Sequence, residues 1–372
     1  MGKLATVFGQ ETAIKALRRA LQAECLPGAY LFVGAEGTGK TAVAQAFAQA
    51  AACLSPIHEP FDPCGDCDSC RRAEAGSHPE IVTIRPAGEQ LQIWQLWDRQ
   101  GRQAPGVLSR SLSYAPVVGR RRVYILEKAD RLTEQAANSL LKILEEPPPY
   151  ALFLLLAPHP ARVLPTIISR CQIVRLGAIG VSELAAYLER SLQIDAARAA
   201  MVAAYAEGRI GQAISLARES AVAEEITHIL DYAEGLPEAP PYRALKAAEQ
   251  LRRLAAQTKA LVGEEVPDAG DAAGTETEGG TAKEKTGRKQ FAAVFDLLVT
   301  FYRDLLALSV GAAQSRLINQ DRISALARLS KHGNPGRWTQ CLDALVMARR
   351  RLDANANTAL VTEILVMRLL AR

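Results

Sequence analysis

The chain has 372 residues, of which 49% are hydrophobic and 23% charged, so it is long enough for two or three domains with their own cores. Its formal net charge of +4 is too small to indicate a nucleic-acid-binding protein by itself. No run of eighteen apolar residues occurs, which excludes a membrane span, and the N-terminus lacks the apolar segment of a secretory signal. We therefore expect a cytoplasmic globular protein without a membrane partner.

Residues 1–178 alternate strand-like and helix-like patterns, which predicts an α/β domain with a parallel sheet. The expected strands are four short apolar runs, at residues 29–33, 81–84, 123–126 and 152–156. An alanine-rich helix is expected over residues 41–52. A second helix is expected from Thr133, a good N-cap residue, to the prolines that begin at Pro147.

A phosphate-binding loop lies between the first strand and the first helix. Successive backbone N–H groups can wrap an anion where glycines allow close approach, and the helix dipole adds to the attraction. Lys40 supplies a positive charge, and Thr41 can hold Mg²⁺. We predict binding of ATP or ADP with Mg²⁺ over a coincidental glycine-rich turn. The predicted nucleotide-binding residues are Gly34, Gly37, Gly39, Lys40 and Thr41.

Four of the seven cysteines follow that helix, in the spacing Cys53-x10-Cys64-x2-Cys67-x2-Cys70. In a chain without export signals, such a cluster indicates metal ligation rather than disulfides. The two-residue gaps let neighbouring thiolates reach one ion, and four thiolates leave no open position for catalysis. We predict a structural Zn²⁺ module at residues 53–70, inserted in the α/β domain.

The strand at 123–126 is followed by Glu127 and Lys128, where an active ATPase of this pattern has Asp and then Glu. Glu127 can still help to hold Mg²⁺. Lys128 can neither accept the proton of an attacking water at neutral pH nor bind the metal. The pattern therefore favours nucleotide binding without turnover. The alternative, in which Lys128 points to solvent and Glu127 is the base, stays open.

The motif Ser169-Arg170-Cys171 follows the last strand. Arg170 can pair with a local acid. It can alternatively reach across a subunit boundary to the γ-phosphate of a neighbour's ATP, because a planar guanidinium suits phosphoryl oxygens. The residue types alone do not decide between the two.

The rest of the chain is predicted to be helical, with one interruption. Residues 179–263 form one helical domain and residues 291–372 another. Residues 264–290 have almost no large apolar side chains and cannot offset their ordering entropy, so we predict a flexible linker rather than an ordered loop. The last domain holds eleven Lys and Arg against six Asp and Glu, a net of +5. That excess suits either contact with DNA or a solvated basic face.

Several motifs, in this order, resemble bacterial clamp-loader subunits of the AAA+ family. The resemblance spans nearly the whole chain apart from residues 264–290, and it implies an AAA+ P-loop domain, a helical lid at 179–263 and an oligomerising helical collar at 291–372. The motifs are Val7–Gln10, residues 34–41, the four cysteines, Asn138–Pro147, Ser169–Cys171 and Leu352–Leu360.

Within that family, the chain resembles the delta prime branch of DNA polymerase III more than the gamma/tau motor branch. Motor subunits have Asp-Glu where this chain has Glu127-Lys128, a sensor threonine where it has Ala157-Pro158, and a sensor arginine at Gly211. Arg170 is retained. The resemblance implies a stator that does not hydrolyse ATP but supplies Arg170 in trans as an arginine finger.

The resemblance also implies partners. These are gamma/tau and delta subunits in a hetero-pentamer, the sliding clamp, and primed DNA through the assembled complex. The chain would then be part of the DNA polymerase III holoenzyme, a DNA-directed DNA polymerase and nucleotidyltransferase, with or without ATPase activity of its own. Two other readings are a catalytic gamma/tau-type ATPase and a zinc-containing DNA-binding protein outside replication.

Overall fold

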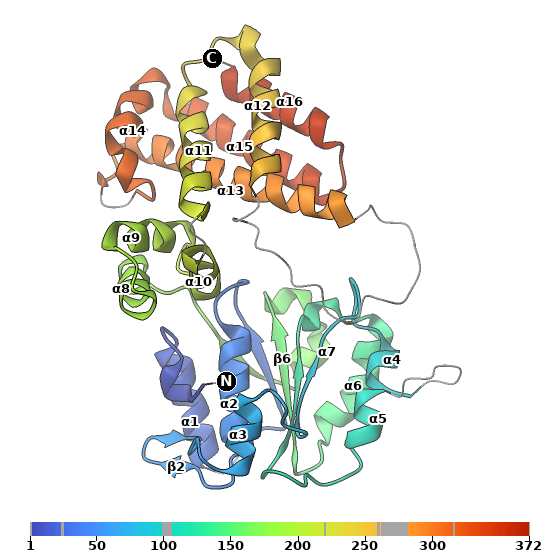
Figure 1. Cartoon of the computed structure of the whole chain (residues 1–372). Coiled ribbons are helices and arrows are strands. Elements are labelled where there is room, and N and C mark those ends of the chain that lie inside the picture. Colours follow the sequence, from blue (N-terminus) through green and yellow to red (C-terminus); the bar gives the residue numbers. More distant parts are fainter. Residues whose placement is uncertain are drawn as a thin grey trace. The chain divides into compact units, whose positions relative to one another are not determined.

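The computed structural model describes residues 2–23, 26–98, 106–218, 221–258, 261, 282–314 and 317–371. The chain forms two compact units (Figure 1). The first unit comprises residues 1–180 together with residues 208–211, and the second comprises residues 181–207 and 212–372.

The first unit is built on a parallel five-stranded sheet. Its strand order is β4-β5-β6-β1-β7, and every neighbouring pair is parallel. Strands β1, β5 and β6 are buried along their whole length, as expected where helices cover both faces of a parallel sheet. The strands are β1 (Ala29–Val33), β4 (Ile81–Ile84), β5 (Arg122–Leu126), β6 (Ala151–Ala157) and β7 (Gln172–Arg175).

Helices cover both faces of this sheet (Figure 1). On one face, α1 (Glu11–Gln22) and α2 (Lys40–Ala52) pack on inward-facing residues such as Phe32. On the other face, α6 (Glu134–Glu145) packs on residues such as Leu31. The hydroxyl of Thr133 accepts a hydrogen bond from the Ala136 N–H at 3.3 Å, so the expected N-cap is confirmed.

The parallel sheet with helices on both faces confirms the prediction of an α/β domain in this part of the chain.

Shorter elements complete the first unit. The helices are α3 (Asp68–Glu74), α4 (Ile93–Leu96), α5 (Val107–Ser111) and α7 (Pro165–Ile168), with a two-stranded antiparallel sheet of β2 (Ile57–His58) and β3 (Phe61–Asp62). Single 3-10 turns are η1 (Leu4–Thr6), η2 (Ala129–Arg131) and η3 (Pro160–Arg162).

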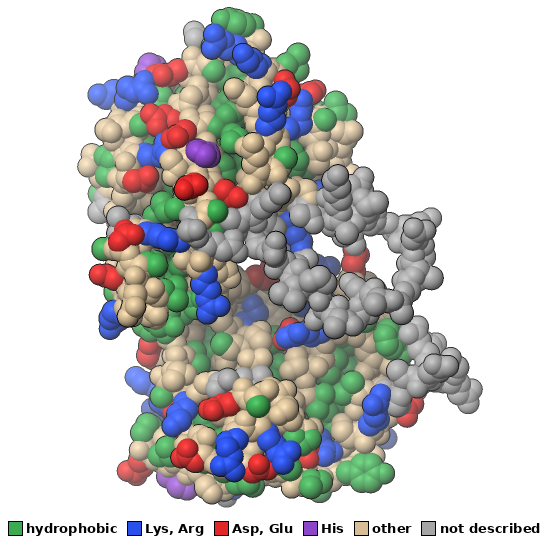
Figure 2. Space-filling model, in the orientation of Figure 1, with side chains coloured by type: hydrophobic (Ala, Val, Ile, Leu, Met, Phe, Trp, Pro, Cys, Tyr) green, Lys and Arg blue, Asp and Glu red, His purple; other side chains and the backbone are tan. Residues whose placement is uncertain are grey.

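The second unit is built of helices joined by turns and loops, with no strand among its described residues. Charged side chains of both signs are spread over the face that Figure 2 shows. Among the described helices, none is long and apolar enough to cross a membrane. The helices are α8 (Val181–Leu192), α9 (Ala196–Tyr205), α10 (Ile210–Arg218), which begins in the first unit, α11 (Ala221–Gly235), α12 (Ala244–Gln257), α13 (Ala282–Ser309), α14 (Ile323–Leu329), α15 (Pro335–Asp353) and α16 (Thr358–Leu370), with 3-10 turns η4 (Pro241–Arg243), η6 (Gln320–Arg322) and η7 (Ser330–His332).

Helix packing divides this half of the chain differently from the sequence analysis. Helices α11 and α12, expected in the lid at 179–263, pack on α13 and α16 of the expected collar. Arg252 of α12 also donates to the Glu363 carboxylate of α16 at 3.1 Å. The two helices bury their apolar faces against the C-terminal helices, which sequence periodicity cannot reveal because it does not show what a face packs against.

The expected linker at 264–290 also differs in its second half. Helix α13 begins at Ala282, because residues 282–290 contain mostly Ala, Lys, Glu, Arg and Gln, which favour helix without adding large apolar side chains. Residues 264–281 lie outside the described part of the chain, so the linker prediction is untested there.

A buried ion pair fastens the amino end of β5. Arg122 donates to the Glu80 carboxylate and to the main-chain oxygens of Ser111 and Tyr114, the last at 2.7 Å. Glu80 also accepts from the Val117 N–H at 2.8 Å. The side chains of Glu80 and Arg122 are only 2% and 8% exposed. Burial alone would raise the pKa of Glu80, but these hydrogen bonds hold it below its usual value.

We expect Arg122→Ala to lower the free energy of unfolding by about 3–5 kcal/mol, because Glu80 would be left buried and unpaired. Urea unfolding at neutral pH measures the loss. In the control Arg72→Ala, which breaks a half-exposed pair with Asp68, the loss should stay below about 1 kcal/mol. Equal losses in the two variants would contradict the buried-pair assignment.

The same pair predicts a pH dependence. The folded pKa of Glu80 lies below its unfolded pKa, so its stabilising contribution is fully present above the unfolded value. It is lost as the pH falls through the folded value. The acid-induced decrease in stability should therefore be smaller in Arg122→Ala than in the unchanged chain.

Candidate functional site

The phosphate loop connects the carboxyl end of β1 to the amino end of α2. Gly37 and Gly39 have φ angles of +83° and +89°, a region that glycine adopts without strain. A Cβ at Gly34 would lie 2.5 Å from the Leu176 main-chain oxygen, so only glycine lets the chain after β7 approach so closely. The loop therefore has the strand-and-helix context that the motif requires.

Lys40 is bonded to its own loop. Its Nζ donates to the main-chain oxygens of Gly34 at 2.6 Å and of Ala35 at 2.8 Å. Burial lowers the pKa of Lys40, and the negative charges of Glu36 and Asp130 oppose that shift. The Asp130 carboxylate is 7% exposed. A nearly buried carboxylate thus acts on the lysine of the phosphate loop.

Two further segments hold the loop in place. Gln10 donates to the Gly177 oxygen at 2.8 Å and to the Thr38 oxygen at 3.4 Å. The Gly211 N–H donates to the Gly37 oxygen at 2.8 Å. A Cβ at Gly211 would be 3.2 Å from that oxygen. The position at which the resemblance expects a sensor arginine is thus a glycine whose backbone touches the loop.

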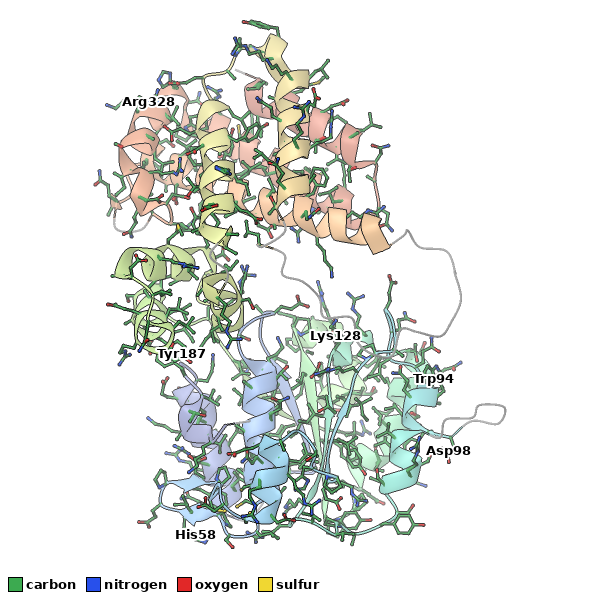
Figure 3. The ribbon with its side chains drawn as sticks, viewed as in Figure 1. His58, Trp94, Asp98, Lys128, Tyr187 and Arg328 are labelled. Carbon is green, nitrogen blue, oxygen red and sulfur yellow. The ribbon has the colours of Figure 1, made fainter. Side chains whose placement is uncertain are left out.

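The carboxylate after β5 is held by an arginine. Arg85 donates through Nε to Glu127 Oε2 at 3.1 Å and through Nη2 to Glu127 Oε1 at 3.4 Å. Lys128 is exposed, has a φ of +55°, and lies just beyond the carboxyl end of β5 (Figure 3). Both oxygens of Glu127 therefore accept a hydrogen bond from Arg85, and a lysine instead of a carboxylate stands at the next position.

The four cysteine sulfurs lie within 4.8 Å of one another. Cys53 Sγ is 3.6 Å from Cys64 Sγ and from Cys70 Sγ, and Cys64 Sγ is 3.8 Å from Cys70 Sγ. These separations are too long for disulfides. They match the edge of about 3.8 Å that four sulfurs have around a tetrahedral zinc ion at about 2.3 Å from each. The cluster can hold such a metal ion.

Backbone N–H groups support the thiolate form of this cluster. The N–H groups of Cys64, Cys67 and Cys70 point at the sulfurs of Cys53, Cys64 and Cys67, each at 3.4 Å. Burial raises the pKa of Cys67, but backbone and side-chain hydrogen bonds outweigh it and lower that pKa to about 6. Burial raises the pKa of Cys53 and of Cys70, so these two thiols would lose their protons on binding a metal, because metal ligation requires thiolates.

The cysteine module is fastened to the rest of the unit by buried polar contacts. Asp62 accepts from the Leu4 N–H at 2.7 Å and from Arg18 Nη2 at 2.8 Å. Ser69 donates to the Ala52 oxygen at 2.9 Å. His58, on the small hairpin at the outer end of the module (Figure 3), is outside the sulfur cluster. The module therefore links the amino-terminal segment to the end of α2.

Arg170 is paired within the chain. Its Nε donates to Glu145 Oε1 at 2.7 Å, and its Nη1 donates to the Thr166 oxygen at 2.8 Å and to Ser169 Oγ at 3.3 Å. The Arg170 side chain is 30% exposed. Burial raises the pKa of the next residue, Cys171, to about 12. In the isolated chain, Arg170 therefore pairs with a local acid, which is the first of the two alternatives from the sequence. This acid is Glu145, at the end of α6.

The sheet separates Arg170 from its own phosphate loop. Arg170 precedes β7, whereas the loop follows β1, and Val33 of β1 pairs in parallel with Arg175 of β7. The two sites thus lie toward opposite ends of the sheet, about 16 Å apart along the strand direction. The structure gathers Gly34, Gly37, Gly39, Lys40 and Thr41 at one end, with Glu127 at the same carboxyl edge, and leaves Arg170 at the other.

Comparison with known proteins decides the family. The family described as "DNA polymerase III, delta subunit" matches residues 9–179, and the one described as "DNA polymerase III, delta subunit, C terminal" matches residues 284–372. The DNA polymerase III subunit delta′ of Bacillus subtilis is 28% identical over 361 residues, covering 97% of this chain and 96% of the relative. The chain belongs to the delta prime family of DNA polymerase III clamp-loader subunits.

Two other relatives show how the likeness is distributed. The subunit delta′ of Pseudomonas aeruginosa is 34% identical over 173 residues, which cover 46% of this chain and 49% of the relative. The subunit tau of Escherichia coli is 35% identical over 217 residues, 57% of this chain. The chain spans 32% of that relative's length. The match to subunit delta′ of Bacillus subtilis over nearly the full length of both chains, in contrast, confirms the delta prime resemblance drawn from the motifs.

Three residues at these sites were not expected from the sequence. Asp130 was visible after Glu127 but had no assigned role, although its spacing on the turn after β5 brings it near Lys40. Arg85 and Glu145 come from distant segments, and no local pattern connects them to Glu127 and Arg170. Only the sheet order and the helix packing bring those pairs together.

We expect about one zinc ion per purified chain, lost on replacing Cys64 and Cys67 by serine. Loss of the ion should lower the melting temperature by several degrees, because binding to the folded module stabilises it. Metal analysis and thermal unfolding measure the two effects. Cys171→Ser, outside the cluster, is the matched control and should keep its metal; retention of zinc by the double variant would refute the site.

Proposed function

We propose that this chain is a stator subunit of a clamp loader, which supplies Arg170 to ATP bound by a neighbouring subunit and does not hydrolyse ATP itself. The observation that carries the proposal is the separation of Arg170 from the chain's own phosphate loop. Because the length of the sheet lies between them, this separation supports an action of Arg170 on a nucleotide held by another subunit rather than by its own loop. A guanidinium near a γ-phosphate stabilises the charge of the transition state.

The surroundings of Arg170 support a role at a subunit boundary. Glu145 and the Thr166 oxygen restrain the guanidinium at the surface of the first unit, and its side chain stays partly exposed. The pair with Glu145 is also partly exposed, so its contribution to stability is small.

Three features of the nucleotide pocket argue against turnover. Arg85 occupies Glu127, and Lys128 stands where a base would be needed. The Lys40 ammonium is bonded to the loop's own oxygens, with which a bound phosphate must compete. Gly211 contacts the loop through its backbone and offers no cationic side chain. The loop residues can still bind ATP or ADP with Mg²⁺.

The proposed partners follow from the family. They are gamma/tau and delta subunits in a hetero-pentamer that places the sliding clamp on primed DNA. The cysteine module, with Zn²⁺ bound, has a structural role in this proposal. It fixes the amino-terminal segment and the end of α2 through Asp62 and Ser69.

We expect Arg170→Ala to lower the DNA- and clamp-stimulated ATPase of the assembled loader by at least about tenfold, because an arginine finger stabilises transition-state charge. Assembly, followed by gel filtration, should be unchanged. Arg162→Ala, which removes an exposed arginine elsewhere in the same unit, is the control. An unchanged ATPase in the assembled Arg170→Ala loader would rule out the assignment.

We expect the isolated chain to show no ATP hydrolysis above that of its Lys40→Ala variant. The reason is that Glu127 accepts hydrogen bonds from Arg85, and a lysine, Lys128, holds the next position, where a base would be needed. Phosphate release measures turnover, and a fluorescent ATP analogue measures binding separately. Hydrolysis that depends on Lys40 would instead support a catalytic subunit of the gamma/tau type.

A further inference from the structure

A cleft of about 600 Å³ lies between α11 and α12 in the helical unit. The two helices run side by side (Figure 1) and contact each other. The α11 side of the cleft is mostly apolar or small, with Gly235, Leu236 and Ala239. On the α12 side, Ala247 and Leu254 are flanked by polar residues. These are Arg243, Lys246, Gln250, Arg253 and Gln257.

The spacing of these five residues explains why they share one surface. They recur at intervals of three and four residues, which places them along a single face of a helix. All five are exposed, whereas Ala248, Leu251 and Ala255 on the other side of α12 are buried. From Arg243 to Arg253 the face extends about 15 Å. It is a polar stripe along one wall of the cleft.

The cleft carries an excess of positive charge. Its acidic lining residue, Asp231, is already paired with Arg322 at 2.7 Å. Arg253 pairs with Glu249 at 2.7 Å, outside the lining. Among the described residues no acidic side chain pairs with Arg243 or Lys246. In Figure 2, Lys and Arg side chains gather over the amino end of α12. The surface is therefore complementary to a polyanion.

An exposed aromatic ring lies beside Arg243, one of the lining residues of the cleft. Tyr242 is 81% exposed, and the guanidinium of Arg243 lies 5.9 Å from the centre of its ring. Exposed aromatic rings beside cations are the usual platform for stacking unpaired bases. An acidic peptide would use the cations but has no comparable need for the ring, so the ring favours nucleic acid.

The cleft is formed before any ligand arrives. The Tyr232 hydroxyl of α11 donates to the Ala247 oxygen of α12 at 2.8 Å, and burial raises the pKa of Tyr232, so it remains a neutral donor. Arg252 fixes the far side of α12 to Glu363 of α16 at 3.1 Å. A preformed groove binds without the cost of ordering its walls.

We propose that this cleft binds single-stranded nucleic acid, with phosphates along Arg243, Lys246 and Arg253 and a base stacked on Tyr242. The site is separate from the phosphate loop and from Arg170, so the inference goes beyond the proposed function and does not depend on it. A stripe of about 15 Å suits a footprint of a few nucleotides.

The test uses the full-length chain and a fluorescein-labelled dT12 oligonucleotide, followed by anisotropy. Binding should weaken with salt, with a slope of log K against log salt near about −2 for three phosphate contacts. The double variant Arg243→Glu with Lys246→Glu should lose at least about tenfold in affinity. Tyr242→Ala should lose at least about fivefold through lost stacking.

The matched control is Lys331→Glu with Arg350→Glu, which makes the same charge change at exposed positions elsewhere in the helical unit. Its affinity should be within about twofold of the unchanged chain, since distant exposed charges are screened. An equal loss in this control would overturn the site, and so would the absence of any binding by the unchanged chain. Displacement of dT12 by polyglutamate as readily as by unlabelled dT12, with no effect of Tyr242→Ala, would assign the cleft to an acidic protein partner instead.

Discussion

The parallel pairing of β1 with β6 on one side and β7 on the other is the constraint on which the first unit depends. It aligns the carboxyl ends of the strands, so that the phosphate loop, Glu127 and the chain after β7 share one edge. The same pairing leaves the turn before β7 at the opposite edge. A single β-sheet register thus places the phosphate loop at one edge of the sheet and Arg170 at the other, as the proposed role requires.

Much of this arrangement could be predicted from local sequence. Four strands are short apolar runs and Thr133 caps its helix. The spacing of the four cysteines was enough to predict that their sulfurs lie together. Strand β7 was not predicted, because Gln172 and Arg175 interrupt its apolar pattern. Both side chains are exposed, as is common in an edge strand.

Contacts between segments that are distant in the sequence could not be predicted from local patterns. Arg85 reaches Glu127 because β4 and β5 are neighbours, and Gly211 reaches Gly37 because the chain returns to the loop after α9. Helices α11 and α12 carry ordinary amphipathic patterns that are equally compatible with a lid or with the C-terminal helices. Their partners are decided by shape and by pairs such as Arg252 with Glu363, which no periodicity records.

The pairing of Arg170 with Glu145 and Thr166 has a consequence for association. A free arginine side chain samples many rotamers, and freezing it at an interface costs about 0.5–1.5 kcal/mol. Here most of that entropy is already lost inside the isolated subunit. In the proposed role, a neighbour that takes over the guanidinium would exchange one acceptor for another instead of ordering a mobile side chain, so the entropic cost of docking would be lower.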